Sequence, residues 1–317
     1  MIVTVTSNPS VDRTITVGRL RHGEVNRADD ARTDPGGKGI NVSRAVAAHG
    51  GDTLAVLPVG GAHGRMMTDL LTGTGVPVRA VPISEGIRAN VAIVEPDGTT
   101  TKVNEPGPHL TTDEVTAFLD AVRATVEATP GAWVVGCGSL PGGVAEDFYA
   151  HLVRLGHEVG ARVAIDTSGT PLPSAIPAGP DLVKPNRVEL GELVGADLDT
   201  LGDVADAARD LVAGGVGRVL VSLGRDGALL VTDDRAVRAV ATVDRPASTV
   251  GAGDCALAGF LLALDRGSDP VQALEQAVAF GAAAVALPGT GVPSRHDVGA
   301  VRVRLDTEPC RTDRLTD

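Results

Sequence analysis

The stretch STVGAGDCALAGFLLAL, residues 248–264, joins a glycine turn to an apolar helix. Its Gly251, Ala252 and Gly253 would bring bare backbone close to a ligand. The start of the helix favours an anion there, because free N–H groups and the helix dipole both attract negative charge. Yet Asp254, itself an anion, lies in the mouth of that site. The question is therefore why a carboxylate occupies a position that would suit a phosphate group.

Two interpretations explain Asp254. A carboxylate would repel a phosphoryl group bound by residues 251–253, so Asp254 is poorly suited to binding it. It is well suited to accept the proton of a hydroxyl that attacks this group, with the backbone N–H groups stabilising the transferred charge. The simpler alternative is an Asp N-cap on a structural helix. The local stretch leaves both interpretations open.

The elements around this stretch predict an α/β fold. Continuously apolar runs that end in polar residues alternate with helical patterns, which is typical of a mainly parallel sheet covered by helices on both faces. We expect strands at 2–7, 53–60, 132–140, 161–169, 181–186 and 217–224, and helices at 40–49, 113–128, 144–159, 204–213, 256–264 and 271–287. Ligands bind beyond the carboxyl ends of such strands. Position alone thus makes candidates of Asn8, Ser139, Asp166, Asn186 and Ser222.

Two stretches break this alternation. Residues 12–33 and 86–106 are polar and extended, and the second contains the turn signal PDGTT. We expect both to form strands outside the main sheet, as a small β lid. Residues 1–303 then make one α/β domain that includes this lid. Residues 304–317 form a polar C-terminal tail that we expect to fray.

Composition excludes several classes of protein. The chain has 317 residues and a formal net charge of -12, which argues against nucleic-acid binding. No apolar run reaches 18 residues and no basic segment precedes an apolar one at the start, so we expect neither a membrane protein nor a signal peptide. Three widely spaced cysteines predict reduced thiols in a cytoplasmic protein. Neither a P-loop pattern nor GxGxxG occurs.

A second glycine turn precedes another predicted helix, in DPGGKGINVSRAVAAHGG at 34–51. Lys38 and Asn41 lie where they can reach a sugar or its phosphate. The chain has only three lysines, at 38, 102 and 184, although it has 28 basic residues. Either this distribution is chance, or the turns at Lys38 and Lys184 require a compact ammonium charge.

The stretch KPNRVEL at 184–190 places Asn186 and Glu189 three residues apart, on one face of a helix. Such a pair could hold Mg²⁺ through water, because Mg²⁺ keeps much of its hydration. The same spacing is typical of a capping box at a helix start. Both interpretations can hold together.

Taken together, these motifs resemble those of the ribokinase-like sugar kinases of the phosphofructokinase B group. GGKGINVSRA resembles the first signature of the group and STVGAGDCALAGF the second, while CGSLPGGV, DTSG, KPNRVEL and VSLGRDGALL follow in the expected order between them. The match covers residues 1 to about 300. KVNEPGP and GGKGIN favour the branch of 1-phosphofructokinases and tagatose-6-phosphate kinases, whereas LPVGGAHG resembles the 6-phosphofructokinase branch. The resemblance implies a three-layer α/β sandwich.

The resemblance also implies an ATP-dependent phosphotransferase that uses Mg²⁺. Asp254 would be its base, with residues 251–253 as the anion hole. The sugar hydroxyls would meet Asp12, Gly37, Lys38 and Asn41, and the phosphorylated end of the substrate would meet Arg88, Asn90, Asn104 and Ser139. The nucleotide site would hold Lys184, Asn186, Ser222, Gly224 and Gly227, with Glu189 and Asn186 near the metal. Cys255 stands where the group often has Ser, and we interpret it as a packing residue.

Three functions compete: a kinase for a sugar phosphate, a kinase for a nucleoside or free sugar, and a non-catalytic sugar-phosphate sensor. A nucleoside site would need aromatic faces, but the chain has one Trp, one Tyr and four Phe, none of them in the lid stretches. The lid instead carries cations such as Arg88. A sensor would lack the base or the anion hole. We therefore expect a kinase for a ketohexose phosphate, most simply fructose 1-phosphate, and a homodimer formed through the lid.

Overall fold

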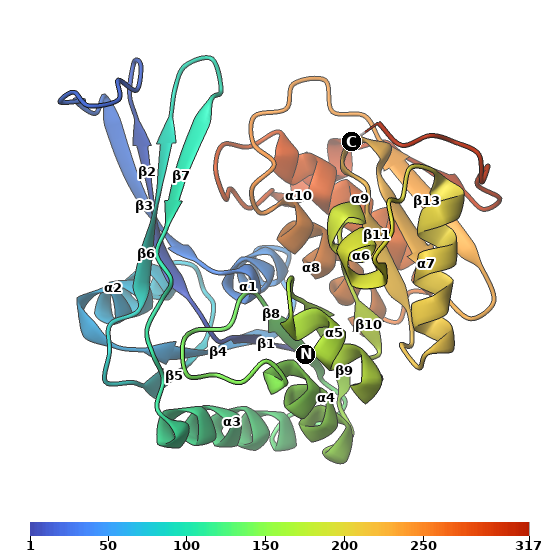
Figure 1. The fold of residues 1–317 in the computed structure, drawn as a ribbon, viewed down its shortest axis with the longest axis horizontal. Helices are drawn as coiled ribbons and strands as arrows, with labels where there is room; N and C mark the ends of the chain where they lie inside the picture. Colours follow the sequence, from blue (N-terminus) through green and yellow to red (C-terminus); the bar gives the residue numbers. More distant parts are fainter. Residues whose placement is uncertain (317) are drawn as a thin grey trace.

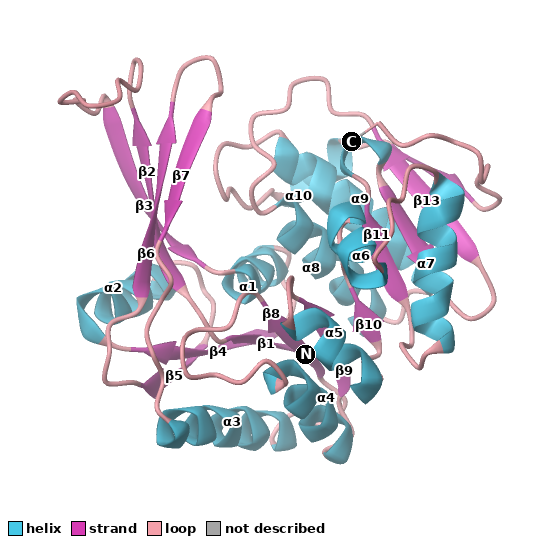
Figure 2. Ribbon diagram, viewed as in Figure 1, coloured by secondary structure: helices cyan, strands magenta, loops and turns pink. Residues whose placement is uncertain are grey.

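The computed structural model describes residues 1–316, which form two sheets flanked by helices (Figures 1 and 2). The large sheet has ten strands in the order β14-β13-β12-β11-β10-β9-β8-β1-β4-β5. Its strands are β1 (Ile2–Thr6), β4 (Thr53–Val59), β5 (Val78–Pro82), β8 (Trp133–Cys137), β9 (Arg162–Asp166), β10 (Leu182–Val183), β11 (Val219–Ser222), β12 (Ala228–Val231), β13 (Ala236–Ala241) and β14 (Val303–Asp306). The expected ribokinase-like, mainly parallel sheet is confirmed: pairing is parallel from β5 to β11 and antiparallel from β11 to β14.

The helices follow the strands along the chain. They are α1 (Lys38–Ala48), α2 (Gly61–Thr72), α3 (Thr112–Glu127), α4 (Phe148–Glu158), α5 (Pro171–Ala175), α6 (Arg187–Val194), α7 (Leu201–Ala213), α8 (Ala252–Asp265), α9 (Pro270–Val285) and α10 (Arg295–Ala300), with short 3₁₀ turns at Ile176–Ala178 and Gly224–Asp226. The patterns at 40–49, 113–128, 144–159, 204–213, 256–264 and 271–287 thus lie on α1, α3, α4, α7, α8 and α9. Helices α2, α5 and α10 were not predicted from the sequence.

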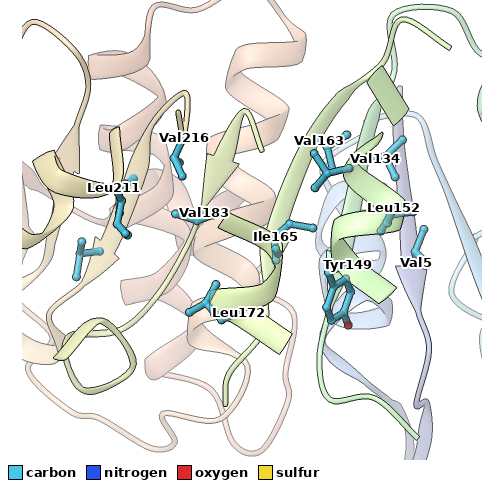
Figure 3. Close-up of a cluster of buried hydrophobic side chains, with 14 of the residues drawn as sticks. Val5, Val134, Tyr149, Leu152, Val163, Ile165, Leu172, Val183, Leu211 and Val216 are labelled. Atoms are coloured by element: carbon cyan, nitrogen blue, oxygen red, sulfur yellow. The ribbon is translucent and has the colours of Figure 1, made fainter. Parts of the chain in front are cut away.

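Alternating side chains of the strands supply the two largest of three hydrophobic clusters, one on each face of the sheet, and the smaller third lies beneath α2. Val3 and Val5 of β1 face the core beneath α3, α4, α5 and α7, where Tyr149 and Leu152 are fully buried (Figure 3). Ile2, on the opposite face, lies in the core beneath α1, α8, α9 and α10. This two-sided burial explains why the strands are apolar throughout rather than alternating.

The second sheet stands apart from the first (Figure 1). It has four strands, β2 (Ser10–Thr16), β3 (Asp30–Gly36), β6 (Arg88–Val94) and β7 (Thr100–Asn104), in the order β3-β2-β6-β7. We call it the lid sheet. It arises from the two stretches that interrupt the α/β pattern, and it places β3 directly before α1. Its edge strand β7 is exposed along its whole length.

The C-terminal segment is better ordered than its composition suggests, and our expectation that it frays is wrong. Residues 303–306 form β14, which pairs with β13. Beyond it, the backbone N–H groups of Leu201 and Gly202 donate to the carbonyls of Asp313 and Arg311, at 2.9 and 2.8 Å. The segment thereby satisfies the free N–H groups at the start of α7. No helix within residues 1–316 is long and apolar enough to span a membrane.

Candidate active site

The glycine turn at 251–253 opens α8 directly. Gly251 is the N-cap residue, with a φ of 78°, a left-handed conformation that favours glycine, and no side chain caps the helix. Asp254 is therefore not the N-cap, and that alternative is wrong. Its carboxylate instead accepts a hydrogen bond from Nδ2 of Asn41 on α1, at 2.8 Å. The side chain thus joins the starts of two helices that are distant in sequence.

A carboxylate paired with two lysines lies beside Asp254. Asp166, at the end of β9, is fully buried and receives Nζ of Lys38 at 2.8 Å and Nζ of Lys184 at 3.1 Å. Burial alone would raise the pKa of Asp166, but the two ammonium groups lower it below its usual value. Asp166 therefore remains ionised and fixes both lysines next to the glycine turn. Position at a strand end had already made Asp166 a candidate, but the sequence did not show its partners.

Asp254 has the electrostatics of a general base. Burial and the nearby charge of Asp166 raise its pKa to about 7, although Asn41, Lys184 and Lys38 favour the ionised form. A base with a pKa near the working pH combines ionisation with proton affinity, which is the condition for efficient proton transfer. As a whole residue, Asp254 is 7% exposed.

This pKa predicts how activity depends on pH. As a base, Asp254 would react in its ionised form, and its pKa is raised to about 7. Activity should therefore rise with pH and level off above about pH 7, and kcat/KM, which reports the free enzyme, should fall about tenfold per pH unit well below it. A profile of kcat/KM for the sugar phosphate between pH 5.5 and 8.5 tests this. A profile that stays flat down to pH 5.5 would contradict the role of Asp254.

Lys184 and the glycine turn share one space. A Cβ built on Gly253 would lie 3.2 Å from Nζ of Lys184, so this ammonium lies against the bare backbone at the start of α8. Backbone N–H groups and an ammonium that converge in this way suit a phosphoryl group in transfer. The structure thus brings together Asp254, Gly253, Lys184, Lys38 and Asn41.

A second cluster lies at the foot of the lid sheet. Asp12 accepts hydrogen bonds from Oγ of Ser10 at 2.6 Å and from Nδ2 of Asn90 at 3.0 Å. Burial raises the pKa of Asp12, while these two donors and Arg88 act in the opposite direction. Gly36, which is opposite Ser10, could not carry a Cβ because it would overlap the Asp12 carboxylate. Asn104 lies opposite Asn90 on β7 and is exposed.

Arg88 and Ser139 border the same cluster. The Arg88 guanidinium donates to the backbone carbonyls of Glu105 at 3.0 Å and Asn8 at 3.2 Å. Its Nε is buried and has no hydrogen-bond partner. Nδ2 of Asn8 donates to Oγ of Ser139 at 3.2 Å. Arg88 is thus oriented by carbonyls and keeps a buried donor unused.

Asn8 was a candidate by position alone, and its surroundings favour a role in ligand binding. It is 4% exposed, its amide joins Ser139 to the carbonyl of Pro106, and its Oδ1 is buried without a partner. Oδ1 of Asn90 is in the same state. Buried polar atoms without partners are uncommon in folded proteins, so their concentration here indicates a place for a polar ligand.

The residues expected at the nucleotide lie at the ends of β10 and β11. Asn186 and Glu189 form a capping box at the start of α6, with hydrogen bonds of 2.8 and 2.9 Å, so that interpretation is confirmed. Asn186 also forms a β-bridge with Ser222. Gly224 and Gly227 bound the 3₁₀ turn that follows, and a Cβ on Gly227 would overlap the carbonyl of Ala239.

Comparisons with known proteins agree with this geometry. Residues 5–297 match the model of the pfkB family carbohydrate kinases. The chain belongs to the pfkB family. A 1-phosphofructokinase from Rhodobacter capsulatus is 41% identical over 305 residues, which cover 95% of each chain. An ATP-dependent 6-phosphofructokinase isozyme 2 from Mycobacterium tuberculosis is 38% identical over 301 residues, covering 94% of this chain and 87% of the relative.

Solved structures place this pfkB kinase in the same fold. Phosphofructokinase-2 from Escherichia coli, in complex with substrates and products, superposes with a TM-score of 0.88 at 34% identity and covers 94% of this chain and 97% of the other. A ribokinase from Thermotoga maritima, 20% identical with a TM-score of 0.75 and coverage of 95% and 98%, shares the fold alone. The chain is therefore a phosphotransferase that acts on an alcohol group of a carbohydrate, as kinases of this family do.

Cys255 follows Asp254, and its surroundings are those of a packing residue. It is 3% exposed and lies in the core between the sheet and α8. Burial and the nearby Asp254 raise the pKa of its thiol to about 12. At neutral pH the side chain is thus a neutral thiol, which gives it neither thiolate reactivity nor charge beside the base.

Proposed function

We propose that this pfkB kinase transfers the γ-phosphoryl group of ATP to the free hydroxymethyl group of fructose 1-phosphate and produces fructose 1,6-bisphosphate. The observation that carries the proposal is the buried Asp254, held by Asn41 at 2.8 Å at the start of α8, with Lys38 and Lys184 beside it. The similarity to a 1-phosphofructokinase over 95% of both chains supports this choice of substrate.

In the proposed reaction, Asp254 accepts the proton of the attacking hydroxyl. The hydroxyl oxygen forms a bond to the γ-phosphorus, the bond from phosphorus to the bridging oxygen breaks, and ADP leaves. The N–H groups of residues 251–253 and the ammonium of Lys184 stabilise the charge on the transferred group. Asn41 orients the carboxylate of Asp254, and Lys38 contacts the sugar. Gly37 has no side chain, so the sugar can approach the backbone there. Asp12 accepts hydrogen bonds from sugar hydroxyls.

The phosphate already on the sugar would lie near Arg88, Asn90, Asn104 and Ser139. The Nε of Arg88 is a buried donor without a partner. The buried Oδ1 atoms of Asn8 and Asn90 nearby could accept hydrogen bonds from sugar hydroxyls next to the phosphate ester. A guanidinium that is already oriented loses little freedom when it binds phosphate. This cluster is what separates a sugar-phosphate kinase from a free-sugar kinase.

The residues present fit Mg²⁺ bound with ATP. Burial would lower the pKa of Lys38, but Asp166, Glu189 and Asp254 together raise it, so the carboxylate of Glu189 acts on the same space as the lysine pair. Within residues 1–316 no group of acidic, His and Cys side chains could hold a metal unaided. Mg²⁺ characteristically takes its other ligands from phosphates and water. Glu189 and Asn186 would hold it through water, and the ion would neutralise charge on the phosphates.

One other substrate set has support of its own. The 38% identity to a 6-phosphofructokinase isozyme is close to the 41% identity to a 1-phosphofructokinase. An assay of ADP release with fructose 1-phosphate, fructose 6-phosphate and tagatose 6-phosphate separates the alternatives. We expect the largest kcat/KM for fructose 1-phosphate. A larger value for either 6-phosphate would move the proposal to the 6-phosphofructokinase or tagatose-6-phosphate kinase branch. Activity with none of the three would reject it.

We further propose that the kinase works in the cytoplasm as a homodimer joined through the lid sheet. Two large apolar side chains of the lid are exposed. Val25, in the loop between β2 and β3, is 84% exposed, and Val103, on β7, is 58% exposed. Its edge strand β7 offers unpaired backbone groups, which proteins usually cover. Among the solved relatives, Escherichia coli phosphofructokinase-2 also has a tetrameric inhibited form.

Light scattering tests this assembly. We expect a particle of twice the 32.1 kDa of one chain at assay concentration. Val103→Asp, which adds charge to the exposed edge, should shift the particle toward one chain. The matched change Val188→Asp, on the exposed surface of α6, should leave the dimer intact. A monomeric wild-type protein with full activity would contradict the proposal.

A further inference from the structure

A pocket of about 870 Å³ lies where α1 and α8 end, at the opposite end of these helices from Asp254. It is lined by His49, which follows α1, by Arg266 and Ser268 beyond α8, and by Gln272 on α9 and Arg295 on α10. The fourteen residues of α8 span about 20 Å at 1.5 Å per residue. The pocket is therefore separate from the candidate active site.

Two guanidinium groups converge in this pocket. Arg266 and Arg295 each donate through one terminal nitrogen to the backbone carbonyl of His49, at 2.9 and 3.1 Å. Two cations that donate to one oxygen are close enough to repel each other. Among residues 1–316 neither arginine forms an ion pair with a carboxylate, and Glu275 is the one acidic residue in the pocket lining. The lining therefore carries an excess of positive charge on a protein whose net charge is -12.

The simpler explanation is that the arginines cap α1. One cation at a helix C-terminus satisfies a free carbonyl and complements the helix dipole. It does not explain a second guanidinium on the same oxygen, nor the polar side chains of Ser268 and Gln272 around an open volume. The positive charge of the two arginines also acts on His49. Burial lowers the pKa of its imidazole, and Arg295 and Arg266 lower this pKa further, although the hydrogen bond to the carbonyl of Pro293 raises it. Positive charge is thus concentrated at this pocket beyond what the cap needs.

We propose that this pocket binds a small phosphate-bearing anion with at least two negative charges, at a site distinct from the catalytic one. The free N–H groups of Arg266 and Arg295 would hold the phosphate oxygens by charge-assisted hydrogen bonds. Ser268 and Gln272 are placed to meet the remaining polar groups of the ligand. The inference does not depend on which sugar phosphate the kinase uses.

Calorimetric titration with inorganic pyrophosphate, without Mg²⁺ and at low salt, tests the site. The variant Arg266→Gln/Arg295→Gln keeps an amide donor for the His49 carbonyl but removes both charges. We expect it to lose one binding event or to bind at that event at least about tenfold more weakly. Glu275→Gln removes the opposing carboxylate and should tighten the same event. Binding at the active site contributes equally to all proteins and cancels from the comparison.

Arg154→Gln is the matched control, because Arg154 is an exposed arginine of α4 on the other face of the sheet. It should bind pyrophosphate as the wild-type protein does. Identical isotherms for the wild-type protein and the double variant would overturn the proposal, as would an equal loss in Arg154→Gln. Each single variant, Arg266→Gln or Arg295→Gln, provides the same comparison if the double variant does not fold. Unchanged kcat in the variants shows that the catalytic site is intact.

Discussion

Replacing Asp254 by asparagine is expected to lower kcat by about 10²–10⁴-fold, the usual contribution of a general base. Asparagine keeps the shape of the side chain and can still accept the hydrogen bond from Asn41. It cannot take the proton of the attacking hydroxyl. Because the proposed role of Asp254 is to take the proton of the sugar hydroxyl, the affinity for ATP should change little. Single-turnover kinetics and nucleotide titration measure the two effects separately.

The same substitution should stabilise the protein, and this separates a base from a structural carboxylate. Burial and Asp166 raise the pKa of Asp254 from 3.8 to about 7, so ionising it opposes folding. Stability from a raised carboxyl pKa is present at low pH and is lost as the pH rises from about 4 through about 7. At pH 8, Asp254→Asn should therefore gain stability, at most on the order of 4 kcal/mol, since each pKa unit corresponds to about 1.4 kcal/mol. Thermal unfolding at pH 5 and pH 8 tests it: the gain should appear at pH 8.

Near-normal kcat in Asp254→Asn would contradict the base. A variant that loses both activity and stability at pH 8 would point to a structural role instead. Cys255→Ser provides the control, because it alters the neighbouring buried residue without removing the carboxylate. Cys255→Ser should leave the pH dependence of kcat/KM unchanged.

Truncating Arg88 to alanine is expected to lower kcat/KM for the sugar phosphate by about 30-fold to 10³-fold, or about 2–4 kcal/mol. The guanidinium is held by the carbonyls of Glu105 and Asn8, so its loss removes an oriented cation and leaves those groups without their donor. KM for ATP should stay nearly unchanged. Arg88→Lys should recover only part of the loss, because an ammonium cannot make a two-pronged contact with phosphate.

Free fructose and Arg13 provide the controls for this prediction. The unphosphorylated sugar should be a poor substrate for both enzymes and should be almost unaffected by Arg88→Ala. Arg13→Ala removes an exposed arginine from the neighbouring strand β2 and should leave kcat/KM for the sugar phosphate within a few fold. If Arg88→Ala weakens free fructose and fructose 1-phosphate by the same factor, Arg88 does not recognise the phosphate.

The parallel part of the fold was predictable because its strands are buried on both faces. The stretches 53–60 and 132–140 each contain a continuous apolar run followed by Gly or a polar residue, which indicated both the strands and the edge where ligands bind. Pairing direction was not predictable for β12, since a four-residue apolar strand looks alike in either direction. The helix α2 begins in GGAHG, whose glycines indicate a turn rather than a helix.

The candidate site was predictable where a motif is local and was missed where it depends on distant partners. The capping box of Asn186 and Glu189 follows from their spacing. The pairing of Asp166 with Lys38 joins residues 128 positions apart, so nothing in the neighbouring sequence shows it. The C-terminal segment was misjudged for the same reason, because its order comes from backbone hydrogen bonds to α7 rather than from apolar side chains.

The hydrogen bond between Asn41 and Asp254 joins residues that are 213 positions apart in the chain. During synthesis from the N-terminus, α1, β8 and β9 leave the ribosome long before α8, so Lys38, Asn41 and Asp166 are made well before Asp254. Contacts of such long separation form late, because chain closure must come before they stabilise anything. Recovery of catalytic activity during refolding should therefore lag behind recovery of secondary structure. Enzyme activity in this molecule would then report a late, long-range docking step.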